Sequence, residues 1–175
     1  MKKSISVLVL FVLMAMSAFA QHLSIDRRTN QGELGQNYIT FYSYPRGSPR
    51  LKPGNSPAGH AWVGFKVVAR DGTSFEFLRG LDREEILPDG RTIPSGMRAE
   101  DPGIKRLATR SLTVQVNTDT YKNAEAVYIP GAWIMGYRDC VTYAANVARA
   151  IGLRVGILAE PFPDDFLITL QSDNR

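Results

Sequence analysis

The sequence is poor in the residues that cross-link a chain or bind metal ions: of its 175 residues, one is cysteine and two are histidine. A single cysteine excludes a disulfide bond within the chain. No second cysteine and no group of histidine with aspartate or glutamate occurs at metal-ligand spacing, which argues against a zinc site. Glycine-rich phosphate loops and a Gly-x-Ser-x-Gly turn are also missing. We therefore expect neither a metal nor a cofactor.

Long apolar runs are missing after the first twenty residues, and no later segment approaches the roughly 20 apolar residues that a spanning helix needs. The start itself combines Lys2 and Lys3, an apolar run over residues 5–16, and small residues up to Ala20. This order is typical of a secretory signal peptide. We expect cleavage near Ala20 and a secreted or periplasmic protein without a transmembrane segment.

A strong excess of one charge is missing as well. The formal net charge is +4, and Lys2 and Lys3 of the expected signal peptide carry two of these positive charges. The remaining basic residues are scattered along the chain and form no basic stripe or cluster. Nucleic acid is therefore not an expected partner.

After the signal peptide, residues 21–36 are polar and without periodicity, which predicts an N-terminal arm. Residues 37–175 are expected to form one domain. Its strands are predicted from alternating, β-branched and aromatic residues, and its helices from caps and apolar spacing. The strands are expected at residues 37–44, 59–69, 74–80 and 110–116, and the helices at 117–129 and 139–152. A turn that leads into a short amphipathic helix is expected within 161–170. Strands followed by helices favour an α+β fold with an antiparallel sheet.

Two segments are predicted to be irregular. Residues 45–58 contain four prolines and read as a loop of restricted shape. Residues 81–105 are a polar excursion rich in proline and glycine, too irregular for a core element, which we expect to cover or border a binding cleft.

The only cysteine, Cys140, stands at the start of the predicted helix at 139–152, directly after Asp139 as its cap. The unpaired amides and positive dipole end of a helix N-terminus favour a thiolate, which makes Cys140 a candidate nucleophile. An ionised Asp139 opposes this effect, but as a cap its carboxylate is turned onto the helix amides. The alternatives are that Cys140 is a small buried residue without chemistry, or that it forms a disulfide with another chain.

A thiol nucleophile needs a base, and histidine suits this role near neutral pH. His60 begins an apolar predicted strand, whereas His22 lies in the unpatterned arm, so His60 is the candidate base. A two-residue turn at Asp71-Gly72 brings His60 opposite residues 81–83 of the next strand, which favours Asp82 as the residue that orients the imidazole. Glu76 is the alternative if a bulge near Gly80 changes the register.

The oxyanion of such a reaction requires hydrogen-bond donors. The amide of Cys140 and its neighbours in the first helical turn are available, and Tyr137, three residues earlier, offers a hydroxyl. Each candidate also has an ordinary structural interpretation. His60 can be a strand-edge residue, Asp82 and Glu76 surface acids, and Tyr137 a packing residue of its loop.

Two motifs together resemble a known superfamily. They are Gly59-His60-Ala61-Trp62-Val63-Gly64-Phe65 and, much later, Tyr137-Arg138-Asp139-Cys140-Val141-Thr142-Tyr143 with a helix ending Ala150-Ile151-Gly152-Leu153. This order is similar to the circularly permuted branch of the NlpC-type, papain-like cysteine peptidases, which includes lecithin retinol acyltransferase-like proteins. The resemblance implies a papain-like α+β core with an antiparallel sheet against the cysteine helix, Cys140 as nucleophile, His60 as base, and a polar third residue on the following strand. Asp139 departs from the asparagine that many members have there.

Three functions are compatible with these residues. The first is an exported cysteine hydrolase that cleaves an amide bond of a cell-wall or other peptide through an acyl-enzyme. The second is acyl transfer or hydrolysis on lipids, for which an apolar groove is conceivable from the aromatic residues Tyr38, Phe41, Tyr42, Tyr44 and Trp133. The third is a catalytically silent module that binds a peptide or glycan.

Overall fold

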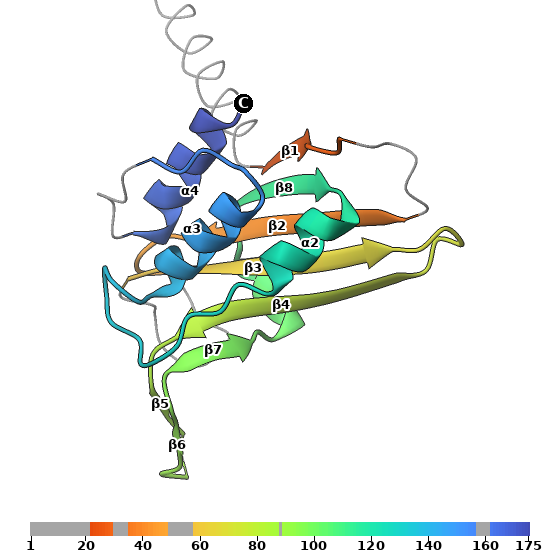
Figure 1. Cartoon of the computed structure of the whole chain (residues 1–175). Coiled ribbons are helices and arrows are strands. Elements are labelled where there is room, and N and C mark those ends of the chain that lie inside the picture. The colour runs from red at the N-terminus through yellow and green to blue at the C-terminus, as the bar shows by residue number, and fades with distance from the viewer. Residues whose placement is uncertain (1–21, 30–34, 49–57, 88, 157–161) are drawn as a thin grey trace, which may run out of the picture.

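The computed structural model describes residues 22–29, 35–48, 58–87, 89–156 and 162–175. A six-stranded sheet has helices α2, α3 and α4 on one face (Figure 1). The strands are β1 (His22–Asp26), β2 (Gln36–Tyr44), β3 (His60–Val68), β4 (Ser74–Asp82), β7 (Gly96–Ala99) and β8 (Arg110–Val116), and a separate pair is formed by β5 (Glu85–Ile86) and β6 (Thr92–Ile93). The helices are α2 (Thr118–Glu125), α3 (Cys140–Ala150), α4 (Pro163–Asp173) and the 3-10 helix η1 (Pro102–Leu107).

The strand order in the sheet is β1-β8-β2-β3-β4-β7. Every neighbouring pair is antiparallel except β1 and β8, which run parallel. The predicted α+β class with a mostly antiparallel sheet is therefore confirmed. No helix in the described part of the chain is long and apolar enough to cross a membrane. The predicted signal peptide and most of the loop at 45–58 lie outside the described residues.

Side chains alternate between the two faces of the sheet and build two apolar clusters. The main core joins one face to the helices, through residues such as Phe41, Val63 and Val147. The opposite face carries a smaller cluster, in which Tyr42 stacks on Trp62 at 5.3 Å between ring centroids. Helix η1 covers this cluster with Ile104 and Leu107.

The hairpin between β3 and β4 differs from the prediction by one residue. The amide of Ala69 donates to the Thr73 carbonyl at 2.8 Å, so the loop holds three residues rather than two. Gly72 ends this loop at φ +84°, a left-handed conformation that glycine adopts at little cost. The register pairs Trp62 with Gly80, and two residues further along it brings His60 opposite Asp82.

Two segments without a clear sequence pattern contain short regular elements. The predicted arm at 21–36 includes β1, which pairs with β8 and places Leu23 and Ile25 against the core. The excursion at 81–105 is not irregular throughout, because it contains β5, β6, β7 and η1. Its strands have two to four residues, too few for a period-two pattern to be visible.

The predicted helices are largely confirmed. Helix α3 begins at Cys140 and is followed by Gly152 at φ +72°, as the cap and the glycine indicated. Helix α2 begins as predicted but ends at Glu125, four residues before the predicted end. The residues between Glu125 and Cys140 form a loop that runs past β7 to α3 (Figure 1).

Candidate functional site

The N-terminus of α3 presents Cys140. The carboxylate of Asp139 caps this helix: Oδ1 accepts from the Thr142 amide at 2.8 Å, and Oδ2 accepts from the Gly136 amide at 2.5 Å. Asp139 is thus turned onto backbone amides, as the sequence predicted. Both Asp139 and Cys140 are buried, and Cys140 is a free thiol. The amide of Cys140 is in the first turn and has no carbonyl acceptor within the helix.

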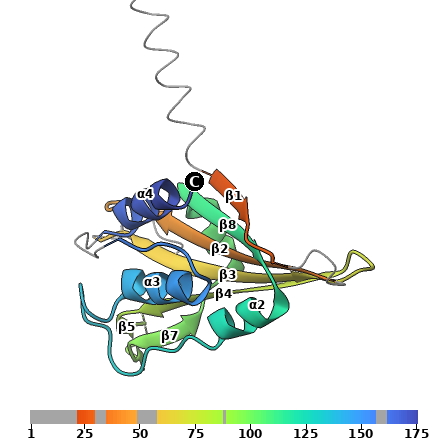
Figure 2. The same cartoon turned by 45° about the horizontal axis from the view of Figure 1, so that its top comes forward.

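The imidazole of His60 meets this helix end. His60 is the first residue of β3, and α3 starts at the end of the sheet where β3 begins and β4 finishes (Figures 1 and 2). The ring stacks on Trp62 at 5.7 Å between centroids, which fixes its plane. The side chain of Cys140 lies close enough to the same imidazole to raise its pKa, through hydrogen bonding and charge. The two candidates identified from the sequence are therefore brought together.

Glu100 occupies the third position of this constellation. Its Oε1 lies 2.7 Å from His60 Nε2, a strong hydrogen-bond distance. The amide of Glu100 donates to the Leu78 carbonyl at 3.0 Å, which anchors it at the end of β7 beside β4. Since Glu100 engages Nε2, Nδ1 is the ring nitrogen that remains for the thiol proton.

Gly80 creates the space for this contact. A methyl group on Gly80 would collide with Oε1 of Glu100 and lie 3.2 Å from His60 Nε2. Any side chain at this position would therefore displace the carboxylate from the imidazole. Gly80 is the sequence signal that a second group approaches the strand beside His60.

Asp82 also reaches the site, but in a different position. Its Oδ1 lies 3.7 Å from His60 Nε2, beyond hydrogen-bond distance. Its side chain is 30% exposed, against 11% for Glu100. Glu100, rather than the predicted Asp82, thus makes the close contact with the imidazole. Sequence reasoning missed Glu100 because it follows a four-residue strand inside a segment without periodicity.

The other predicted candidates lie elsewhere. Glu76 is six residues before Asp82 on β4, roughly 20 Å along an extended strand, and pairs with Lys105 at 2.5 Å. His22 contacts Ser111 through Nδ1 at 2.9 Å on the opposite edge of the sheet. The Tyr137 side chain is exposed and its ring faces the Arg138 guanidinium. No hydrogen bond of the Tyr137 hydroxyl to the site occurs among the described residues.

The predicted aromatic groove does not form as one surface. Phe41 faces the main core, whereas Tyr42 and Tyr44 belong to the cluster on the opposite face of the sheet. Tyr38 shares the face of Tyr42 by strand alternation, and Trp133 packs against the main core. Phe41 and Trp133 are therefore core residues, whereas the Tyr44 ring lies 6.0 Å from the His60 ring on the other face.

The electrostatics of the site favour a charged imidazole. Burial alone lowers the pKa of His60, but hydrogen bonds to Cys140 and Glu100 and their negative charges raise it well above the ordinary value of 6.5. Burial also raises the pKa of the Asp82 carboxyl, with the charge of His60 opposing this shift and that of Glu100 adding to it. The arrangement can therefore hold an imidazolium between a thiol group and a carboxylate.

The same residues also form a group of metal-ligand type. One ligand atom each from His60, Asp82 and Glu100 lies within 4.8 Å of the others. The sequence spacing did not reveal this cluster, because the three residues come from three different strand ends. His60 Nε2 is already within hydrogen-bond distance of Glu100, and we assign the group to orientation of the imidazole.

Comparison of the chain with models of protein families, with curated proteins and with solved structures finds no match in any of the three.

Proposed function

We propose that this protein is a cysteine hydrolase that cleaves amide bonds through an acyl-enzyme, built on a circularly permuted papain-like core. The observation that carries the proposal is the joint placement of Cys140, His60 and Glu100, with the thiol at a helix start and the imidazole between thiol and carboxylate. A nucleophile, a base and an orienting group in hydrogen-bond reach are the parts that covalent hydrolysis needs.

The reaction follows from these positions. The thiol proton of Cys140 passes to Nδ1 of His60, and Sγ attacks the carbonyl carbon of the substrate amide. The tetrahedral intermediate collapses as the C–N bond breaks, and the leaving nitrogen takes the proton from Nδ1. A water molecule then gives a proton to Nδ1 and attacks the thioester carbon. The C–S bond breaks, the carboxylic acid leaves, and Sγ takes the proton back from Nδ1.

Glu100 and the helix start support this sequence of steps. The Glu100 carboxylate accepts from Nε2 and stabilises the imidazolium that forms after the first proton transfer. The Cys140 amide, which lacks an intrahelical acceptor, points a donor towards the oxyanion. The Tyr137 hydroxyl remains a predicted additional donor, and its loop would need to close over the substrate to supply it.

The substrate we propose is a peptide outside the cytoplasm, such as a cell-wall peptide. The signal-peptide pattern of residues 1–20 supports export. The assay is release of peptide fragments from purified cell wall by the full protein, compared with Cys140→Ala and His60→Ala. Both variants should fold and lose turnover, and retained turnover in Cys140→Ala would refute the thiol mechanism.

A second candidate function is hydrolysis or transfer of an acyl chain from a lipid. Exposed apolar side chains of Ile134, Met135 and Tyr137 precede the nucleophile directly in the chain and favour it. Release of acyl chains from lipid vesicles, set beside release of peptides from cell wall, separates the two functions. A native thiol that an electrophile labels only after unfolding would instead indicate a silent binding module.

A further inference from the structure

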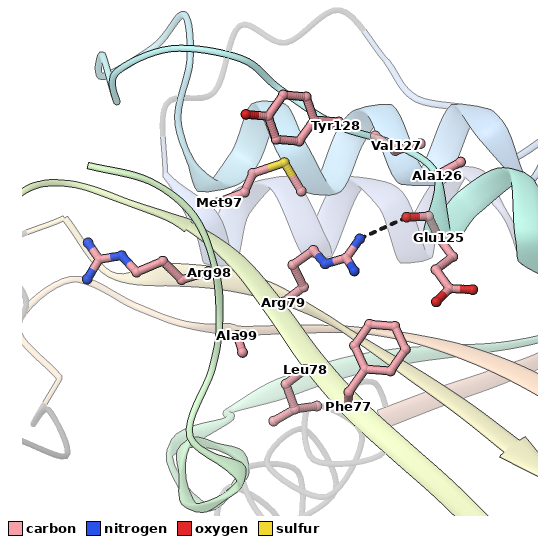
Figure 3. Close-up of a pocket in the computed structure, with 10 residues that line it drawn as sticks. All are labelled: Phe77, Leu78, Arg79, Met97, Arg98, Ala99, Glu125, Ala126, Val127 and Tyr128. Carbon is pink, nitrogen blue, oxygen red and sulfur yellow. Dashed lines mark hydrogen bonds between the residues drawn. The ribbon is translucent and has the colours of Figure 1, made fainter. Parts of the chain in front are cut away.

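A pocket lies between β4, β7 and the residues at and after the end of α2 (Figure 3). Its volume is about 370 Å³, within the range of small-ligand pockets. Apolar groups form most of its wall, including Phe77, Met97, Val127 and Tyr128. The proposed reaction makes no use of this space.

Arg79 is the cation of this pocket. Its Nη1 donates to the Glu125 carbonyl at the end of α2, at 2.8 Å, as the dashed line in Figure 3 shows. Its guanidinium also lies over the rings of Phe77 and Phe65, at 5.2 and 5.8 Å from the centroids. Within the described ranges, no carboxylate forms an ion pair with Arg79. The Tyr143 hydroxyl is also close enough to this guanidinium for Arg79 to oppose the rise of the Tyr143 pKa. The N–H groups that the Glu125 carbonyl and Tyr143 do not use remain for an acceptor that enters the pocket.

Arg98, the second arginine that lines the pocket, is close to carboxylates. The Arg98 side chain extends away from the Arg79 guanidinium in Figure 3 and lies between two carboxylates, 3.9 Å from Asp82 and 3.6 Å from Glu85. Its charge is thus balanced by the protein. The unbalanced positive charge in the pocket belongs to Arg79.

We propose that this pocket binds an organic carboxylate with a small apolar body, with Arg79 as the anion-binding residue. The guanidinium fork matches a carboxylate in a bidentate geometry, and the apolar wall suits an aliphatic side chain. Glu125 lines the same pocket, and its carboxylate weakens binding of an anion. This inference goes beyond the proposed function, because it does not depend on the chemistry of Cys140.

The test is a calorimetric titration of the full protein with N-acetyl-leucine and, as matched probe, N-acetyl-leucinamide. The acid should bind about tenfold or more tightly than the amide, as expected for a charge-assisted hydrogen-bond pair. Arg79→Gln should remove this preference. Glu125→Gln should strengthen binding of the acid and leave the amide unchanged. Arg91→Gln, at a side chain 78% exposed on the distant hairpin, should change neither.

Three results would overturn the proposal: equal binding of acid and amide, no binding of either, or an acid preference that survives Arg79→Gln. Arg79 would then serve only as a cap of α2. If Arg79→Gln does not fold, the same titration is made with Arg79→Lys and Glu125→Gln. A loss of affinity with Arg79→Lys and a gain with Glu125→Gln support the pocket, because a purely structural role predicts neither. The readout is binding, so it is independent of turnover at Cys140.

Discussion

The substitution Glu100→Gln tests the role of the residue that sequence reasoning missed. It keeps the size of the side chain and removes its charge. The substitution weakens the hydrogen bond between Glu100 Oε1 and His60 Nε2, which are 2.7 Å apart. The Glu100 side chain is only 11% exposed. A hydrogen bond to a charged group contributes about 1.5–3 kcal/mol.

That free energy sets the size of the expected effect. At about 1.4 kcal/mol for each factor of ten, the imidazolium becomes about 10- to 150-fold harder to form. Because the thiol of Cys140 reacts after its proton moves to His60, its reactivity near neutral pH should fall by the same factor. The pKa of His60 should also move down towards its ordinary value.

The assay is the rate at which iodoacetamide alkylates the intact protein, followed by mass. Cys140 is the only cysteine, so a single addition reports on the site alone. Asp82→Asn is the matched control, because Asp82 lies 3.7 Å from Nε2 without a hydrogen bond and should change the rate less than about fivefold. Wild-type reactivity in Glu100→Gln, or a larger loss in Asp82→Asn, would refute the assignment of Glu100.

Three further predictions concern the surroundings of this pair. Gly80→Ala should reduce alkylation about as strongly as Glu100→Gln, because the added methyl displaces the Glu100 carboxylate; an unchanged rate would mean that this contact is unimportant. Asp139→Ala should lower the free energy of unfolding in denaturant by about 2 kcal/mol, the upper end for a helix cap, since both oxygens of this buried carboxylate accept from backbone amides. The raised pKa of His60 means that the folded chain holds a proton that the unfolded chain releases above pH 6.5, so the free energy of unfolding should decrease as pH rises from there through the folded pKa. His60→Gln should lack that decrease, and an identical pH profile would contradict it.

The parts of the site that could be predicted from sequence are those with local signals. Asp139 and Gly152 delimit α3 through capping chemistry, which acts within one helical turn. His60 was identified because only one of two histidines begins a patterned strand. The loop of the β3–β4 hairpin was predicted one residue too short. This error shifts the register by one residue, so Asp82 still fell within the region 81–83 predicted opposite His60.

The parts that could not be predicted depend on pairings between distant segments. Glu100 reaches His60 because β7 pairs with the far end of β4, and a four-residue edge strand has too few positions to show alternation. Strand β1 joins the sheet through parallel pairing with β8, almost ninety residues away. Its two apolar residues, Leu23 and Ile25, were the available signal, but two residues do not distinguish a strand from a polar arm.

The central claim is that Cys140 and His60 form one proton-sharing pair, and an NMR titration of the imidazole tests it most directly. The chain has two histidines, so His22→Gln assigns both signals. The account predicts that His60 titrates well above 6.5 in the wild-type protein and at lower pH in Cys140→Ala, because the substitution removes one of the two partners that raise its pKa. A His60 titration that is the same with and without the thiol would contradict the pairing.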